Sequence, residues 1–410
     1  MAAEWRDITL GDFVALQRGH DLTEPERRIG RVPVIGSAGQ NGFHDTALAK
    51  GPGIVIGRSG ASFGQVHFSK EDFWPHNTGL YVTDFKGNEP LFAFYFLKAI
   101  DFSGYNSGSA QPSLNRNFIY SIPVRIPPLA EQKAIAAVLG ALDDKIELNR
   151  RMNATLEAMA RALFQSWFVD FDPVRAKLDG RPPAALDPTT AALFPEHFDH
   201  KVEGVIPTGW RATTLGEVIE ISDSKRIPLS GREREARQGK YPYHGAASVM
   251  DYVDDFLFDG IYALMGEDGS VINEDGTPVL QYVWGKFWVN NHAHVLRGKN
   301  GISTEHVLLH LKGSIIAPFV NGAVQPKLNQ GNMNRIPFMI PAPEIGQAFS
   351  KAIDPLFAQI RANTEQSRTL ATLRDTLLPK LLSGELSVGD EERQIERATS
   401  WKPQLTPPTS

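Results

Sequence analysis

The amino-acid sequence predicts an α+β chain that carries one architecture twice, a β-rich globule followed by a long helix. Two observations carry this prediction. Residues 131–167 repeat apolar side chains at heptad spacing, which is typical of a long helix with a buried seam. The same spacing returns at 349–381, and short motifs recur at matching positions in the segments that precede the two helices. We therefore interpret the chain as a tandem duplication.

The first globule, residues 1–126, mixes short β-rich runs with Gly and Pro punctuation. GRSGASFG at 57–64 lacks the lysine of a phosphate-binding loop, so its glycines indicate a tight turn, with close backbone approach to a ligand as the alternative. We expect strands at 54–56, 65–68 and 80–82, and a helix at 89–102.

The first long helix is expected within 127–171, where strong helix formers dominate. Its apolar seam is broken in the middle by Asn149 and Asn153. The seam has two columns, Ile135, Leu142, Leu156 and Leu163 in one and Leu139, Ile146 and Trp167 in the other.

A Pro- and Ala-rich segment, 172–208, is expected to be a linker, partly packed against the helix. The second globule, 209–343, opens with WRATTLGEV at Trp210, which matches WRDITLGDF at Trp5. The pair YPYHGAA and VPVIGSA follows, and IYALM, QYVWG and HAHVL predict strands. Both globules then carry Gln-Pro-x-Leu-Asn, at 111–115 and 325–329.

The second long helix is expected within 344–385, and its seam has the same polar interruption, at Asn363 and Ser367. Pro355 and Pro379 predict kinks or ends, so the unbroken part should lie between them. The polar, Pro-rich residues 386–410 are expected to be a disordered tail.

The composition is that of a globular protein of two or more domains, with 410 residues, 42% of them hydrophobic and 22% charged. The absence of cysteine excludes disulfides and Cys-based zinc sites and fits the cytoplasm, where we expect this protein. The N-terminus lacks a signal-peptide pattern and the most apolar run, 91–100, is short, so no membrane association is expected. A net charge of −5 confines any nucleic-acid binding to local patches.

Motifs for catalysis are missing from the sequence. No G-x-x-x-x-G-K-[ST] or helix-opening G-x-G-x-x-G occurs, so no cofactor site is expected. His306 and His310 have helical spacing, but Val307 stands where a zinc protease has glutamate, so we interpret both as structural, like His292 and His294. The acidic run 266–276 misses calcium-loop spacing and predicts a solvated loop, so no metal site is expected.

Together these features resemble the specificity subunit of type I DNA restriction-modification enzymes. The similarity runs from Trp5 to about Leu386 and rests most on the central stretch. The residues that carry it are IPPLAEQKAIAAVLGALDDKIELNRRMNATLEAMARALFQSWFVDFDPVRAK at 126–177, TAALFP before the second globule, the two Trp-x-x-x-x-Leu-Gly openings, the two Gln-Pro-x-Leu-Asn motifs and LLPKLLSGEL from Leu377.

The resemblance implies that each globule is a target-recognition domain that binds one half of a bipartite site in double-stranded DNA. Two long antiparallel coiled-coil helices would hold the domains apart. Two methyltransferase subunits would dock on the helices and carry S-adenosylmethionine, restriction (motor-nuclease) subunits would complete the complex, and this chain would be non-catalytic. The alternatives are a structural coiled-coil adaptor and a self-contained DNA methyltransferase or nuclease.

In an antiparallel pair, seam residues meet when their numbers add to a constant. Placing Asn149 on Ser367 then places Asn153 on Asn363, a register-fixing polar contact. A parallel pair would also satisfy the heptads, so the antiparallel choice follows from the resemblance. About 28 seam residues span roughly 42 Å, or about 12 base pairs, so half-site centres should lie about one helical turn apart.

Apolar residues off the first seam predict docking of partner helices, with packing against the linker as the alternative. DNA contacts are expected from polar loop residues, each of which has an ordinary solvated loop residue as its alternative. The candidates are Arg18, Arg58, Ser59, Ser62, Gln65, Asn106, Ser109 and Asn115 in the first globule, and Lys225, Arg226, Lys286, Asn321, Gln325, Lys327 and Asn329 in the second.

Overall fold

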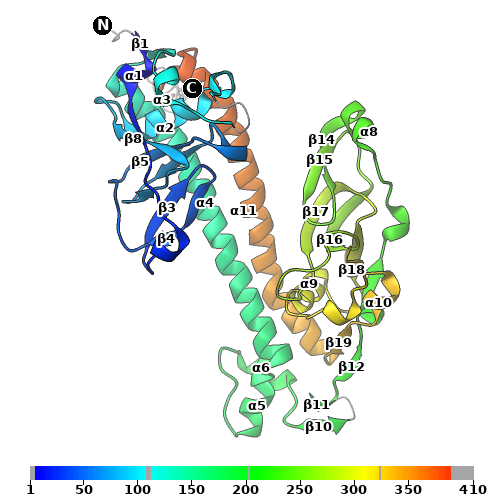
Figure 1. The fold of residues 1–410 in the computed structure, drawn as a ribbon. Helices are drawn as coiled ribbons and strands as arrows, with labels where there is room; N and C mark the ends of the chain where they lie inside the picture. The colour runs from blue at the N-terminus through cyan, green and yellow to red at the C-terminus, as the bar shows by residue number, and fades with distance from the viewer. Residues whose placement is uncertain (1–4, 108–111, 202–203, 323–324, 389–410) are drawn as a thin grey trace, which may run out of the picture. The chain divides into compact units, whose positions relative to one another are not determined.

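A computed structural model describes residues 5–107, 112–201, 204–322 and 325–388. The chain divides into two compact units (Figure 1), and each is described by itself. The first unit comprises residues 1–148 and 366–410, and the second comprises residues 149–365. The long helices α4 (Leu129–Phe164) and α11 (Pro343–Ser383) each contribute residues to both units.

The first unit is built on a four-stranded antiparallel sheet in the order β2-β8-β5-β6. Val55, at its centre, pairs with His67 on one side and Tyr81 on the other. The three strands predicted for this globule are confirmed as β5, β6 and β8. The strands are β2 (Ala15–Arg18), β5 (Gly53–Gly57), β6 (Val66–Ser69) and β8 (Gly79–Asp84).

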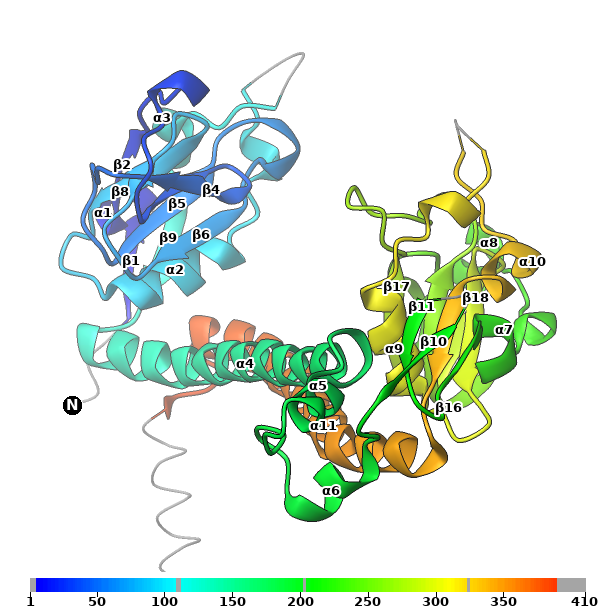
Figure 2. The ribbon, with the colours of Figure 1, turned by 90° about the horizontal axis from the view of Figure 1, so that it is seen from below.

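Two smaller sheets complete the β-structure of this unit. One contains β4 (Gly39–His44), β3 (Val32–Gly36) and β7 (Trp74–Pro75), and the other pairs β1 (Arg6–Thr9) with β9 (Pro123–Ile126). The predicted helix at 89–102 is confirmed as α2 (Pro90–Ala99), which packs against β5 and β6 (Figure 2). Two one-turn helices are α1 (Leu10–Phe13) and α3 (Arg116–Ile119).

The core of the first unit includes the ends of both long helices. Ile135 and Leu139 of α4 and Leu381 of α11 are buried in one cluster with Phe13 and Phe92. Asp143 of α4 accepts a hydrogen bond from the Tyr95 hydroxyl (2.6 Å) and pairs with Arg374 of α11 (2.5 Å). Arg374, which stands at a seam position where an apolar residue is due, therefore forms an ion pair instead.

The second unit is built on a six-stranded sheet in the order β13-β18-β16-β17-β14-β15. All neighbouring strands are antiparallel except β14 and β17, which are parallel. Helix α9 (Thr304–Lys312) packs against β16, β17 and β18 (Figure 2). The strands are β13 (Ile219–Ile221), β14 (Gln238–His244), β15 (Val249–Val253), β16 (Phe258–Gly266), β17 (Leu280–Val289) and β18 (Ala293–Gly298), which confirms the three predicted here.

The segment 172–208, expected to be a linker, has secondary structure of its own. Val174 and Phe194 are buried in the core of the second unit, so their burial orders the segment. It holds α5 (Asp172–Leu178), α6 (Pro188–Leu193) and the hairpin β10 (Phe198–Lys201) and β11 (Gly204–Pro207). The unit also contains β12 (Arg211–Thr214) paired with β19 (Pro337–Ile340), α7 (Leu215–Val218), α8 (Gly231–Ala236) and α10 (Gln330–Asn334).

Within the second unit, the segments of α4 and α11 run antiparallel. Asn363 donates a hydrogen bond from Nδ2 to Oδ1 of Asn153 (2.9 Å), and the ring of Trp167, just beyond the end of α4, lies 5.5 Å from that of Phe349 on α11. Both contacts are pairs that the predicted register places together. Asn149 donates to the backbone carbonyl of Asn363 at 3.3 Å, a contact that the register did not predict.

Helix α11 ends at neither proline, so the expectation that its unbroken part lies between Pro355 and Pro379 is wrong. A proline inside a helix removes one backbone hydrogen bond and crowds the preceding turn. Burial of neighbouring residues offsets that loss, because Ile353 and Phe357 flank the first proline and Leu381 follows the second. Of the predicted tail, residues 389–410 lie outside the described residues, and Val388 packs into the first unit.

Candidate nucleic-acid interface

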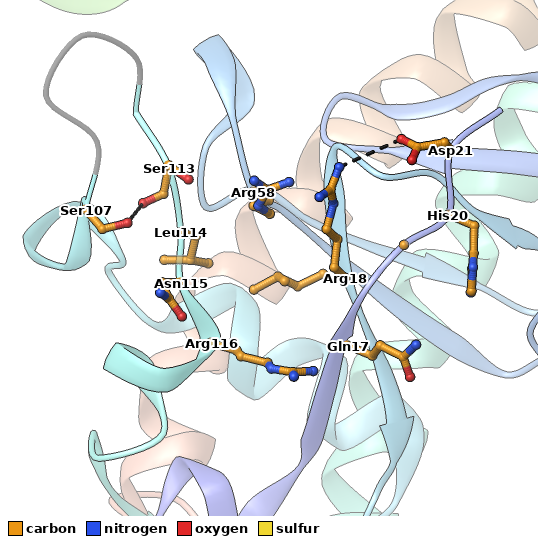
Figure 3. Close-up of a pocket in the computed structure, with 12 residues that line it drawn as sticks. Gln17, Arg18, His20, Asp21, Arg58, Ser107, Ser113, Leu114, Asn115 and Arg116 are labelled. Carbon is orange, nitrogen blue, oxygen red and sulfur yellow. Dashed lines mark hydrogen bonds and ion pairs between the residues drawn. The ribbon is translucent and has the colours of Figure 1, made fainter. Parts of the chain in front are cut away.

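A polar pocket of about 560 Å³ opens in the first unit, where β2, β5 and β8 meet the loop that leads to α3 (Figure 3). Its wall comes from four separate parts of the chain, so folding is needed to assemble it. The lining residues are Gln17, Arg18, Gly19, His20, Asp21, Arg58, Leu80, Ser107, Ser113, Leu114, Asn115 and Arg116.

Arg58 is held in place by the turn that follows β5. A Cβ on Gly57 would lie 2.0 Å from the carbonyl oxygen of Ser62, and Gly60 has φ of +80°, so both positions require glycine. The tight turn predicted at 57–64 is therefore confirmed. The backbone N–H of Arg58 donates to Thr78 (2.9 Å), and its carbonyl accepts from the N–H of Leu114 (2.7 Å).

The pocket is rich in hydrogen-bond donors and positively charged. It has three guanidinium groups, from Arg18, Arg58 and Arg116, and one carboxylate, from Asp21. Nη1 of Arg58 donates to the carbonyl of Asn77 (3.1 Å), and Nη1 of Arg116 donates to that of Leu16 (2.9 Å). Because each guanidinium has five N–H donors, one backbone bond leaves others for a ligand. Such groups bind phosphate oxygens or the O6 and N7 edge of guanine.

The structure brings several of the first-globule candidates together. Arg18, Arg58 and Asn115 line the pocket. Ser59 pairs in a β-bridge with Ser113, and Asn106 accepts a hydrogen bond from the N–H of that same serine (3.0 Å). Ser62 and Gln65 are not among the lining residues and belong to the turn after Arg58, and Ser109 lies outside the described residues.

The two Gln-Pro-x-Leu-Asn motifs have the same structural role in each unit. Their leucines, Leu114 and Leu328, are buried. Their asparagines begin short helices, because Asn115 accepts from the N–H of Asn117 (3.0 Å) and Asn329 from that of Asn332 (2.8 Å). The side-chain oxygens of both asparagines are therefore occupied by caps, and each retains an amide NH₂ for other contacts.

The repeat identifies the corresponding place in the second unit. The sequence Gly266-Glu267-Asp268-Gly269 follows β16 as Gly57-Arg58-Ser59-Gly60 follows β5. The geometry agrees, since a Cβ on Gly266 would lie 2.1 Å from the carbonyl of Ser270 and Gly269 has φ of +81°. The N–H of Leu328 donates to the carbonyl of Glu267 (2.9 Å), as that of Leu114 does to Arg58. Arg58 and Glu267 thus occupy equivalent positions with opposite charge.

A second pair of equivalent positions with opposite charge lies beside Arg58 and Glu267. When the two globules are aligned at their Trp-x-x-x-x-Leu-Gly openings, Arg18 is equivalent to Asp223 and Asp21 is equivalent to Arg226. Arg18 lies 3.8 Å from Asp21, and Arg226 lies 3.5 Å from Asp223, so the same ion pair is present with its partners exchanged. Leu80, in the wall of the first pocket, has His294 as its counterpart in the second unit.

In the second unit this place is filled by a buried polar network. Glu267 pairs with Arg226 (2.7 Å), while Asp223 binds His294 (2.6 Å) and Gln330 (2.7 Å). Nε2 of His294 faces the carbonyl oxygen of Leu328 at 2.7 Å. Both ring nitrogens of His294 therefore lie within hydrogen-bond distance of oxygen atoms.

Burial by itself would raise the pKa of Asp223, but the hydrogen bond from His294 and its charge, with donors from Val295 and Gln330, hold that pKa below its usual value. Asp223, Glu267 and His294 also have ligand atoms within 4.8 Å of one another, as a metal site requires. Both ring nitrogens of His294 are already engaged with oxygen atoms of the protein, and Arg226 already contacts both carboxylates. These residues fit an ion-pair network better than a metal site.

The second-globule candidates are more scattered. The Arg226 side chain is only 12% exposed and is bound within the network, whereas Lys225 beside it is exposed. Asn321, Gln325, Lys327 and Asn329 share one loop, in which Asn321 bridges to Lys327 and Gln325 donates to Asp268 (2.9 Å). Lys286 lies opposite Asp259 near the start of β16, whereas Glu267 follows its end, so the fold does not bring Lys286 to this place.

Several residues of these two places were absent from the sequence-based candidates. A position-by-position alignment of the two globules is the signal that points to them, since Arg18 is aligned with Asp223 and Arg58 with Glu267. The solvated loop expected at 266–276 is wrong for Glu267, whose side chain is 18% exposed and ion-paired. The omitted residues are Gln17, His20, Asp21, Ser107, Ser113 and Arg116 in the first unit, and Asp223, Glu267, His294 and Gln330 in the second.

Comparison with known proteins gives a consistent result. Residues 2–158 and 207–371 match the family model described as "Type I restriction modification DNA specificity domain". The chain is 27% identical over 357 residues to the type I restriction enzyme MjaIX specificity subunit of Methanocaldococcus jannaschii, covering 82% of this chain and 78% of that protein. It is 26% identical over 338 residues to the HindI specificity subunit of Haemophilus influenzae, covering 67% and 71%.

The fold is also similar to a solved structure, the type I restriction-modification S subunit from M. genitalium. The match has a TM-score of 0.58 at 17% identity and covers 92% of this chain and 96% of that one. Among the described residues, no helix has both the length and the apolar character that crossing a membrane requires.

Proposed function

Because the chain belongs to the family of type I restriction-modification DNA specificity subunits, the non-catalytic recognition components of these systems, we propose that it binds a bipartite DNA site with one unit on each half. The observation that carries the proposal is the repeated site. In both units the turn after the β5 or β16 strand and the Gln-Pro-x-Leu-Asn loop lie together, joined by the same backbone hydrogen bond. Polar loops on a rigid sheet are suited to contact base edges and phosphates.

We further propose that α4 and α11 form the antiparallel spacer of the two recognition units. Contacts within each unit support this, since Asp143 pairs with Arg374 in the first and Asn153 with Asn363 in the second. A seam of about 28 residues, at 1.5 Å each, corresponds to about 12 base pairs, so the half-site centres should lie about one helical turn apart.

The proposed partners are two methyltransferase subunits, which would dock on the long helices and bring S-adenosylmethionine, and the restriction subunits of the full complex. Exposed apolar side chains on α4 support docking, because Leu148 is 42% exposed, Met152 36% and Met159 49%. These side chains are not covered by the segment 172–208, the alternative considered for them. Exposed apolar side chains of this kind mark contact surfaces for other proteins when they lie together.

The proposal is tested by duplex-DNA binding of the assembled methyltransferase complex. We expect a sequence-specific shift that weakens steeply as salt rises, because phosphate contacts release counterions. A complex without salt-dependent DNA binding would indicate a structural adaptor. Methylation by this chain alone, without the other subunits, would indicate a self-contained enzyme.

The polar contact between Asn153 and Asn363 gives a prediction about the spacer. Replacing both with leucine should stabilise the second unit and raise its melting temperature, because an apolar pair replaces a buried polar one. The same change should loosen the helix register and broaden the preferred distance between half-sites. Binding to duplexes with half-sites moved by one base pair measures this, and an equally sharp preference in the variant would contradict the register role.

A further inference from the structure

The same place in the two units has opposite electrostatic character. In the first unit, Arg18, Arg58 and Arg116 surround an open pocket, here called the guanidinium pocket. In the second unit, Asp223, Arg226, Glu267, His294 and Gln330 fill the equivalent place, here called the closed network. The same glycine turn and the same backbone hydrogen bond carry both sets, so the electrostatic difference comes from the side chains.

The polar groups of the closed network are paired with one another. Glu267 lies 2.7 Å from Arg226 and Asp223 lies 2.6 Å from His294. Asp223 also accepts hydrogen bonds from the side chain of Gln330 and the N–H of Val295. His294 is fully buried, and both its ring nitrogens lie within hydrogen-bond distance of oxygen atoms. Buried charges that are paired and hydrogen-bonded in this way need no further ligand.

The guanidinium pocket is not balanced in that way. Its one carboxylate, Asp21, lies 3.8 Å from Arg18, and the two side chains are 74% and 55% exposed, so water weakens their attraction. Arg58 and Arg116 bind uncharged backbone carbonyls. Three guanidinium groups around one space repel one another, and an anionic or acceptor-rich ligand would relieve that repulsion.

Arg58 is the best positioned of the three. Its backbone is fixed on both sides, by Thr78 and Leu114, and its Nη1 bond to the carbonyl of Asn77 orients the guanidinium plane. A guanidinium fixed in this way can present two parallel N–H donors to a pair of acceptors. Its counterpart, Glu267, offers only acceptors and is already ion-paired.

We infer that the guanidinium pocket binds an acceptor-only group of the DNA and that this contact depends on Arg58. The second unit has no equivalent arginine, so it binds the other half-site without such a contact. The inference rests on the proposed function. Two parts of DNA offer this chemistry, the oxygens of a backbone phosphate and the O6 and N7 atoms of a guanine edge. In either case the two halves of the site are bound by different chemistry.

The test compares Arg58→Gln and Arg58→Lys with Arg31→Gln in the assembled methyltransferase complex. Arg31 is exposed and is not a lining residue, so its substitution removes one charge outside the pocket. The probes are duplexes that carry the methylated motif, intact or with one guanine changed in either half. Melting temperatures of all variants show that the units remain folded.

We expect Arg58→Gln to weaken binding of the intact duplex at least tenfold and Arg31→Gln to change it less than twofold. If the ligand is a phosphate, Arg58→Gln weakens all sequences alike and lowers the salt slope by about one, while Arg58→Lys retains most of the affinity. If it is a guanine, both substitutions erase discrimination at one position of one half-site.

Binding by Arg58→Gln within twofold of the parent, with the same salt slope and discrimination, would overturn the inference and leave the proposed function standing. Loss of discrimination in both half-sites would also overturn it, because the contact would then not belong to one half. A parent complex without sequence-specific binding would overturn the proposed function itself.

Discussion

Replacing Phe349 with alanine should lower the free energy of unfolding of the second unit by about 3–5 kcal/mol, the usual cost of truncating a buried aromatic residue. Phe349 is fully buried at the start of α11. Its ring lies 6.2 Å from that of Phe164, the last residue of α4, and 5.0 Å from that of His306 on α9, so it joins both long helices to α9. Truncation would leave a cavity among aromatic rings that are held by three helices and cannot close easily.

Chemical unfolding of the full chain measures this effect. The control is Met159→Ala on α4, where the side chain is 49% exposed and little packing is lost. We expect the control to stay within about 0.5 kcal/mol of the parent. A loss below about 1 kcal/mol for Phe349→Ala would contradict the view that this cluster joins the helices to the sheet.

The second large effect is a dependence of stability on pH that comes from His306. Burial and, to a smaller extent, the neighbouring His310 lower the pKa of His306 to about 3. The unfolded chain has the ordinary value of about 6.5. Between those values the unfolded chain binds a proton that the folded chain does not, so stability falls as the pH drops below about 6.5 and continues to fall towards pH 3.

Between pH 7 and pH 4.5 this proton should cost the second unit about 2–3 kcal/mol. His306→Leu, of similar volume and without a titratable group, should lose that part of the pH dependence. The control is His197→Leu, since His197 is exposed and its ring meets water in the folded and the unfolded chain. Urea unfolding of the three proteins at the two pH values measures the difference. An equal loss in His306→Leu and the parent would contradict the assignment.

Periodicity and motif matching predict the two long helices and six of the strands of this chain, β5, β6, β8, β16, β17 and β18. Seam residues such as Ile135 and Leu139 are buried because heptad spacing places them on one side of a helix. The prolines were misjudged because local propensity does not include packing, and the burial of Ile353, Phe357 and Leu381 keeps α11 continuous. The expectation that segment 172–208 packs partly against the helix is confirmed, since the ring of Phe194 lies 5.0 Å from that of Trp167. Its composition does not predict the helices and the hairpin that it forms.

The candidate site was predicted less completely because its parts are far apart in the sequence. Arg18, Arg58 and Asn115 were chosen as polar loop residues, and the fold brings them to one pocket. Arg226 looked equivalent as a basic loop residue, but its partners Asp223 and Glu267 lie on other segments, and only the fold shows that they hold it inside. The polar character of a residue does not tell whether its charge faces DNA or another side chain.

The central claim is that this chain recognises a divided DNA site, with one unit on each half. Sequencing of methylated bases in cells that express the methyltransferase subunits with and without this chain tests it most directly. We predict an interrupted motif, two short blocks with centres about one helical turn apart, that disappears when the chain is absent. A short continuous motif, or the same motif in both cells, would contradict the claim.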